Sequence, residues 1–131
     1  MKFLDLPKEL QQLTQQAEEY AIVAIQNEIE FSPYIYYPEK KMVKIQAEDI
    51  EEAIDTAYDL IEDSEQEKAI FVYHDHIELK DGLFDAIVTQ IHSEDEDNGY
   101  SFALIYRYND NKMEFLNERI FLGGIRNALF L

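Results

Sequence analysis

The side chains best placed for chemistry in this sequence are carboxylates, and they are concentrated in one segment. Residues 48–67 contain ten Asp and Glu residues and no Lys or Arg. On a helix, pairs four positions apart such as Glu51/Asp55 and Asp55/Asp59 repel each other by about 0.2–0.5 kcal/mol. Asp59 and Asp63 would also lie near the negative carboxyl end of that helix, where an acid is unfavourable. A basic protein surface would relieve this repulsion, so the segment predicts a docking face.

A second run of acids, residues 94–97, precedes Asn98-Gly99 in a predicted loop. An EF-hand calcium loop places a glutamate at its twelfth position, whereas the twelfth residue counted from Glu94 is Ile105. The run is therefore predicted to be a solvated hairpin tip that extends the docking face. The alternative for both acidic runs is a solvated surface that keeps the protein soluble. The residues predicted to bind the partner are Glu48, Glu51, Glu52, Asp55, Asp59, Glu62, Asp63, Glu94, Asp95, Glu96 and Asp97.

Two histidines are spaced for metal binding. His74 and His76 fall on a predicted strand, which places both imidazoles on one face about 6.6 Å apart, with Glu78 next on that face. Two histidines and a carboxylate can bind zinc or iron, so these three residues are a candidate metal site, with surface histidines as the alternative. A two-residue turn at Asp81-Gly82 would direct His92 to the other face, and a three-residue loop would direct it to the same face.

Two strand aspartates, Asp75 and Asp85, have largely apolar neighbours and share a face if the hairpin has a three-residue loop. In a cleft they could divide acid and base roles, as in two-carboxylate hydrolysis. The alternative is that each accepts backbone hydrogen bonds. No serine lies in a Gly-x-Ser-x-Gly context, and Gly123-Gly124 lacks the Lys-Ser/Thr of a phosphate-binding loop. No catalytic residue is therefore assigned.

Tyrosines gather between Pro33 and Pro38. Because proline cannot donate to a central ladder, this segment is predicted to be extended or to form a sheet edge. Tyrosine is favoured at interfaces for its apolar ring and polar hydroxyl. Tyr34, Tyr36 and Tyr37 are therefore a candidate exposed aromatic patch, with a packed connector as the alternative.

Two helices are predicted. The first covers residues 6–30, and its all-apolar part leaves Ile22 and Val23 pointing away from the main face and in need of cover. The second runs from near Asp49 to near Ser64, because its apolar residues fall inside one arc of about 160°. Asp49 and Glu52 resemble a capping box at its start.

Strands are predicted where the hydrophobic period becomes two. A short strand covers residues 42–45, and four longer strands cover residues 69–79, 83–91, 100–108 and 113–122. Turn-forming residues separate the long strands, at 81–82, 97–99 and 109–111. The third long strand has an aromatic face that is predicted to pack on the helices, made of Tyr100, Phe102, Leu104, Tyr106 and Tyr108.

The predicted fold is α+β in a single domain, residues 1–131. It is a two-layer sandwich of two N-terminal helices packed on a mainly antiparallel four- to five-stranded sheet, in the order α-β-α-β-β-β-β. An alternative makes residues 42–45, the acidic helix and residues 69–79 a βαβ unit with a parallel strand. The apolar end, residues 125–131, is predicted to dock on the body or on a partner.

Composition excludes several classes of function. The chain has 131 residues, of which 47% are hydrophobic, so it can bury a core and is not expected to be disordered. Its formal net charge of −17 repels phosphate backbones and anionic lipids, so neither nucleic acid nor a membrane is an expected partner. The absence of cysteine removes disulfides and Cys-ligated zinc. With no apolar run of about 18 residues and no secretion-type start, a cytoplasmic protein is expected.

These observations predict a small, acidic, non-catalytic binding protein that docks a basic protein partner, an inhibitor- or immunity-like interaction module without a cofactor. One alternative is a metal-binding protein or metal-dependent hydrolase that uses His74 and His76 with zinc or iron. The other is a structural homo-oligomer, such as a homodimer formed through Ile22 and Val23 or through the carboxyl terminus.

Overall fold

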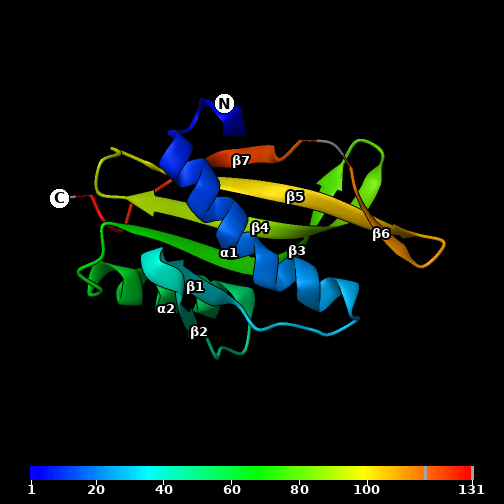
Figure 1. Cartoon of the computed structure of the whole chain (residues 1–131), viewed down its shortest axis with the longest axis horizontal. Coiled ribbons are helices and arrows are strands. Elements are labelled where there is room, and N and C mark those ends of the chain that lie inside the picture. Colours follow the sequence, from blue (N-terminus) through cyan, green and yellow to red (C-terminus); the bar gives the residue numbers. More distant parts are fainter. Residues whose placement is uncertain (117, 131) are drawn as a thin grey trace.

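The computed structural model describes residues 1–116 and 118–130. Over these residues, two α-helices accompany one curled sheet of seven strands (Figure 1). The elements in chain order are α1 (Lys8–Gln26), β1 (Tyr34–Tyr37), β2 (Lys41–Lys44), α2 (Ile50–Glu62), β3 (Lys68–Leu79), β4 (Gly82–Ser93), β5 (Gly99–Asn109), β6 (Lys112–Phe115) and β7 (Ile120–Ile125), with 3₁₀ helices at Phe3–Asp5 and Pro38–Lys40.

The predicted α+β class is confirmed, and the sheet has more strands than the four or five expected. The segment between the two prolines forms β1, and the predicted strand over residues 113–122 forms as β6 and β7. Residue 117 of that predicted strand and residue 131 of the apolar end lie outside the described residues. Within the described part of the chain, neither helix has the length and apolar character needed to cross a bilayer.

The strand order is β2-β1-β3-β4-β5-β6, and all neighbouring strands are antiparallel. On the far side of β5, β7 pairs with its first half and β6 with its second half. Because β1 is antiparallel to both β2 and β3, these two strands run parallel to each other, as the βαβ alternative expected. They are not neighbours, however, since β1 lies between them.

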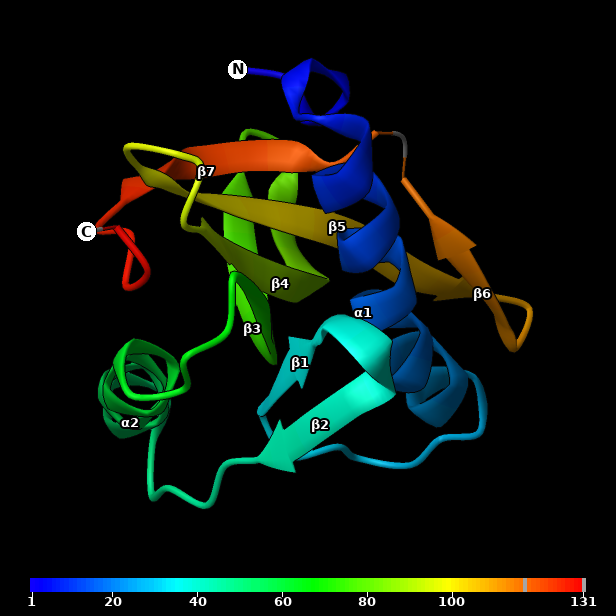
Figure 2. The ribbon, with the colours of Figure 1, turned by 60° about the vertical axis from the view of Figure 1, so that its left-hand side comes forward.

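The helices cover opposite faces of the sheet, so the sheet is the middle layer (Figure 2). α1 packs through Ala17 and Ala21 over β3 and β4, on the sheet face that also carries the aromatic residues of β5, whereas α2 packs through Ala53 and Ala57 on the other face. Of the two helices expected on the aromatic face, α1 alone lies there among the described elements. The reason is visible in β3, where residues 69–73 are buried on both faces and both faces therefore need a cover.

α1 is held on the sheet by a hydrogen bond that reaches into its backbone. The hydroxyl of Tyr34 on β1 accepts a hydrogen bond from the Ala21 amide at 3.2 Å and donates one to the Ala17 carbonyl. Those two backbone groups would ordinarily bond to each other in an α-helix. On the same helix Ile22 is half-buried against the core, while Val23 remains 44% exposed.

α2 begins and ends where its sequence pattern predicts. Asp49 caps it by accepting a hydrogen bond from the Glu52 amide at 2.8 Å, and the Glu52 carboxylate accepts one from the Glu48 amide at 3.0 Å. The helix ends at Glu62, where the spacing of apolar residues stops. This confirms the capping interaction that was predicted from Asp49 and Glu52, with Glu48 as the second donor.

The β3–β4 hairpin has neither of the two predicted registers. Leu79 pairs with Gly82, so the two-residue turn is Lys80-Asp81 and not Asp81-Gly82. The turn between β5 and β6 is as predicted, because Asp110 and Asn111 both have positive φ, at 52° and 64°, which suits a tight hairpin.

The carboxyl-terminal segment packs on the body of the protein. The Asn127 side-chain amide donates to the carbonyls of Ser93 and Glu96, each at 2.6 Å, and the Ala128 amide donates to the His92 ring at 3.1 Å. Leu129 is buried in the core on the α2 face. The sequence predicts that this apolar end docks on the body of the protein or on a partner, and in this structure it contacts the body.

Candidate functional site

Seven carboxylates of the α2 region face outward together, and we call them the acidic ridge: Glu48, Glu51, Glu52, Asp55, Asp59, Glu62 and Asp63. All seven are exposed, whereas Ala53, Ala57 and Ile61 on the inner side of α2 are buried. At 100° per residue the six from Glu51 to Asp63 fall within an arc of about 120°, and Glu48 precedes the Asp49 cap. The ridge is therefore one face of one helix and its cap.

The ridge is almost uncompensated by the protein's own cations. In the part of the chain that the structure describes, Glu62 is the one ridge carboxylate with a Lys or Arg nitrogen within 4.0 Å, through Arg126 Nη2 at 2.7 Å. Arg126 also lies over the Tyr58 ring, 5.0 Å from its centroid. This pair is at the carboxyl end of α2, and as an exposed ion pair it contributes about 0–1 kcal/mol. In the middle of the ridge, neither Asp55 nor Asp59 has a Lys or Arg nitrogen within 4.0 Å among the described residues.

The acidic loop, residues 94–97, lies beside the carboxyl end of α2. Glu62, Glu65 and Glu94 line the same hollow of about 160 Å³. The Glu94 amide donates to the carbonyl of residue 67 at 2.9 Å, which connects the loop to the strand that follows α2. Asp95 lies 3.8 Å from Lys68 Nζ, so part of the loop charge is neutralised. The two acidic segments predicted from the sequence thus meet at one end of the ridge.

The predicted exposed aromatic patch does not form. Tyr34 is 0% exposed and Tyr37 is 6% exposed, and Tyr36 is half-buried. The edge placement expected from the prolines is also wrong, because β1 is an inner strand between β2 and β3. Pro33 and Pro38 lie just outside the paired residues, so neither removes a hydrogen bond from the ladder.

His74, His76 and Glu78 share one face of β3, as predicted, but the carboxylate that lies close to the two imidazoles is not Glu78. Their partner is Asp85, which lies opposite His76 on β4: His76 Nδ1 is 2.8 Å and His74 Nε2 is 3.9 Å from Asp85 Oδ1. Among the described residues, no three His, Asp or Glu side chains are arranged to hold a metal ion. One carboxylate, that of Asp85, thus lies across the strands from both imidazoles.

His92 lies on the opposite face of the sheet from His74, because it pairs with Ala69. It is buried, and its Nδ1 accepts the Ala128 amide. Burial, with a smaller contribution from the positive charge of nearby Arg126, lowers the pKa of His92 to about 4. His92 is therefore a neutral core residue at pH 7.

The predicted pairing of Asp75 with Asp85 is wrong in this register. Asp75 pairs with Ala86 and Asp85 with His76, so the two carboxylates are on opposite faces of the hairpin. Asp75 Oδ1 accepts a hydrogen bond from the His76 amide at 2.8 Å, which is the backbone role that was the alternative.

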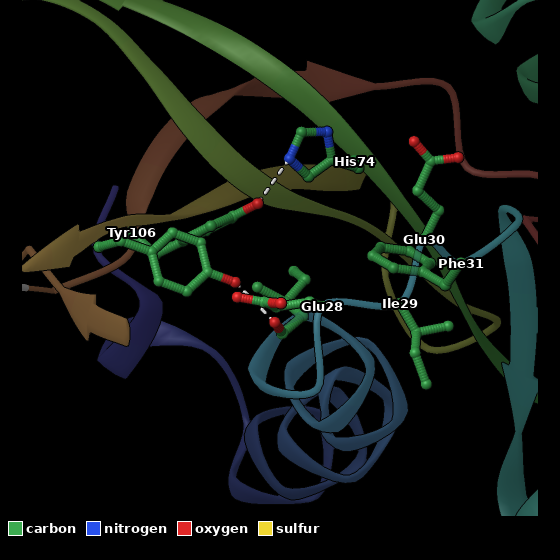
Figure 3. A pocket seen from close by; sticks show the side chains of 8 residues that line it. Glu28, Ile29, Glu30, Phe31, His74 and Tyr106 are labelled. Carbon is green, nitrogen blue, oxygen red and sulfur yellow. Dashed lines mark hydrogen bonds between the residues drawn. The ribbon is translucent and has the colours of Figure 1, made fainter. Parts of the chain in front are cut away.

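A cavity of about 350 Å³ lies beyond the carboxyl end of α1, and sequence reasoning missed it (Figure 3). It is bounded by the end of α1, by the segment that follows, and by β3 and β5. Its lining residues are Ile25, Glu28, Ile29, Glu30, Phe31, His74, Tyr106 and Tyr108. These come from three remote stretches of the chain, and His74 alone among them had been singled out as a candidate site residue.

Two hydrogen bonds define the polar wall of this cavity. His74 Nε2 and the Tyr106 hydroxyl are 2.7 Å apart, and the Tyr108 hydroxyl donates to the Ile25 carbonyl at 2.6 Å. Burial lowers the pKa of His74, although Asp85 opposes this, and burial together with Asp85 raises the pKa of Tyr106 to about 12. His74 and Tyr106 are therefore an uncharged, hydrogen-bonded pair at pH 7.

Comparison with protein-family models, with curated protein sequences and with solved structures finds no match to this chain.

Proposed function

We propose that this protein is a non-catalytic, cytoplasmic binding protein that docks a basic protein partner through the acidic ridge and the adjoining acidic loop, residues 94–97. The observation that carries the proposal is the seven-carboxylate acidic ridge of α2, whose inner face is buried and which has, among the described residues, one cationic neighbour, Arg126.

The electrostatic energy of α2 supports this function. Asp55, Asp59 and Asp63 repel one another along the helix, and Asp59 and Asp63 also face the negative end of the helix dipole. A cationic surface would remove both penalties on binding. It would also approach faster, since the net charge of −17 attracts basic proteins over roughly the Debye length of 8–10 Å at physiological salt.

The test is affinity capture with a charge-reversed ridge and a matched control. The ridge variant is Asp55→Lys/Asp59→Lys/Asp63→Lys, and the control reverses three exposed acids away from α2, Glu19, Asp81 and Glu118. Both carry the same net charge, so they differ only in where the charge lies.

We expect the unaltered protein and the control to retain the same basic proteins, identified by mass spectrometry, and to release them as salt is raised. The ridge variant should retain none of them while its own unfolding free energy is unchanged or higher. Capture of the same proteins by the ridge variant would contradict the proposal.

A further inference from the structure

The cavity beyond α1 combines an apolar wall with a negative rim. Ile25, Ile29 and Phe31 supply the apolar surface, and Glu28 and Glu30 lie between them in the chain. Its volume of about 350 Å³ is at the small end of the roughly 300–1,000 Å³ typical of ligand pockets.

Every charged group that lines the cavity is a carboxylate. Glu28 and Glu30 are exposed, and within residues 1–116 and 118–130 neither has a Lys or Arg nitrogen within 4.0 Å. No Lys or Arg is among the lining residues, and His74 and Tyr106 are uncharged at pH 7. An anionic ligand would therefore be repelled from the cavity.

The carboxyl end of α1 adds to the negative potential. The last turn of α1 contains no basic residue, and the Ile25 carbonyl at the cavity wall already accepts hydrogen bonds from the Tyr108 hydroxyl and the Glu28 amide. The partial negative charge of a helix carboxyl terminus favours a cation close to it.

The aromatic rings of the cavity suit the same ligand. Phe31, Tyr106 and Tyr108 line it together with the His74 ring. A cation over the face of such a ring is attracted by the ring quadrupole, by about 0.5–1 kcal/mol where water has access. Carboxylates, a helix carboxyl end and aromatic rings thus all favour positive charge.

We propose that this cavity binds a small organic cation, an ammonium or guanidinium group on a short apolar stem. The charged head lies toward Glu28 and Glu30, and the stem lies against Ile25, Ile29 and Phe31. The site is on the α1 face of the sheet, opposite the face covered by α2, so it does not depend on the docking function proposed above.

The test is a titration followed by amide chemical shifts, with three probes of nearly the same shape. These are n-butylammonium, n-butanol and butyrate, which are cationic, neutral and anionic. We expect n-butylammonium to give saturable shifts at residues 28–31, 74 and 106, and the other two probes to give none there. Equal binding of n-butanol would overturn the proposal, since it would show a merely apolar pocket.

Variants separate this site from general attraction to an acidic protein. Glu28→Gln/Glu30→Gln should weaken n-butylammonium binding by about tenfold or more, because it removes both carboxylates of the rim. The control Asp55→Asn/Asp59→Asn removes the same charge from the acidic ridge and should leave the affinity within about twofold.

Equal weakening by both pairs of substitutions would overturn the proposal, because it would trace the effect to net charge. The same ammonium group could also come from a lysine side chain of another protein, and a lysine tripeptide tests this source. If the tripeptide shifts residues 28–31 and the free n-butylammonium does not, the cavity receives a protein side chain and the small-molecule proposal is wrong.

Discussion

Arg119 Nε donates a hydrogen bond to Glu18 Oε2 at 2.9 Å, and Arg119 Nη2 donates a second to Glu18 Oε1. Glu18 is 1% exposed on α1, and Arg119 precedes β7, so the pair joins segments 101 residues apart. The Arg119 guanidinium also lies over the Phe3 ring, 4.2 Å from its centroid. Burial raises the pKa of Glu18, and the hydrogen bonds and charge of Arg119 oppose that rise.

Substitution of Arg119 should destabilise the protein strongly. Arg119→Met leaves the Glu18 carboxylate buried without a partner, which costs about 3–5 kcal/mol. Urea denaturation would measure the loss. The double variant Glu18→Leu/Arg119→Met should recover most of the stability, because it leaves no buried charge that needs a partner. Arg107→Met, which removes an exposed partner of Glu114, is the control and should cost less than about 1 kcal/mol. Similar losses for the two arginines would contradict this account.

His92 should make stability depend on pH below neutrality. Its pKa is about 4 in the folded protein against 6.5 for an ordinary histidine, so between these values the unfolded chain binds a proton that the folded one does not. The stabilisation is complete above pH 6.5 and should fall by about 3 kcal/mol as the pH approaches 4. Unfolding free energies of the unaltered protein and His92→Asn, compared across this range, should converge as the pH falls. A constant difference between them would refute the assignment, and exposed His76→Asn provides the control.

The Tyr34 hydroxyl should contribute to stability through its bridge in α1. Tyr34→Phe removes the donor to the Ala17 carbonyl and the acceptor of the Ala21 amide, in a fully buried position. We expect a loss of about 1–2 kcal/mol in the unfolding free energy, measured by denaturant titration. Tyr36→Phe is the matched control on the same strand and should change stability by less than about 0.5 kcal/mol. Equal losses of unfolding free energy in Tyr34→Phe and Tyr36→Phe would contradict a stabilising role of the Tyr34 hydroxyl.

Repulsion within the acidic ridge should be measurable without a partner. Asp59→Asn removes a charge between Asp55 and Asp63 near the carboxyl end of α2, so it should stabilise the protein by about 0.5–1 kcal/mol at low salt. Glu51→Gln removes a charge at the amino end, where an acid is favourable, and should have the opposite sign. Thermal unfolding at low salt and in 1 M salt would show whether both effects shrink with screening. If Asp59→Asn and Glu51→Gln changed the stability in the same direction, the result would argue against electrostatic repulsion within the acidic ridge.

Local patterns predicted local structure well. The spacing of apolar residues and the Asp49 cap placed α2 correctly, and Asp110 and Asn111 form the expected turn. These predictions succeeded because their signals lie within a few residues of one another. The β3–β4 hairpin shows the limit, because its register differs by one residue from the three-residue-loop register, and this difference places Asp75 and Asp85 on opposite faces.

The candidate site was only partly predictable. The outward direction of the acidic ridge follows from helical periodicity, and the contact between α2 and the acidic loop does not. The cavity was missed because its walls come from the end of α1, from β3 and from β5. The sequence marks His74 only as a candidate metal ligand and its hydrogen-bond partner Tyr106 only as part of an aromatic core face.

The amino-acid sequence by itself determined the acidic charge, the two helices, the alternation of the long strands and the outward face of α2, because each depends on neighbours along the chain. Tertiary structure decided which face each helix covers, that β1 is an inner strand, that Glu18 meets Arg119 and that a cavity opens beside His74. Those outcomes depend on burying both faces of one sheet at once, and that requirement joins residues far apart in the chain.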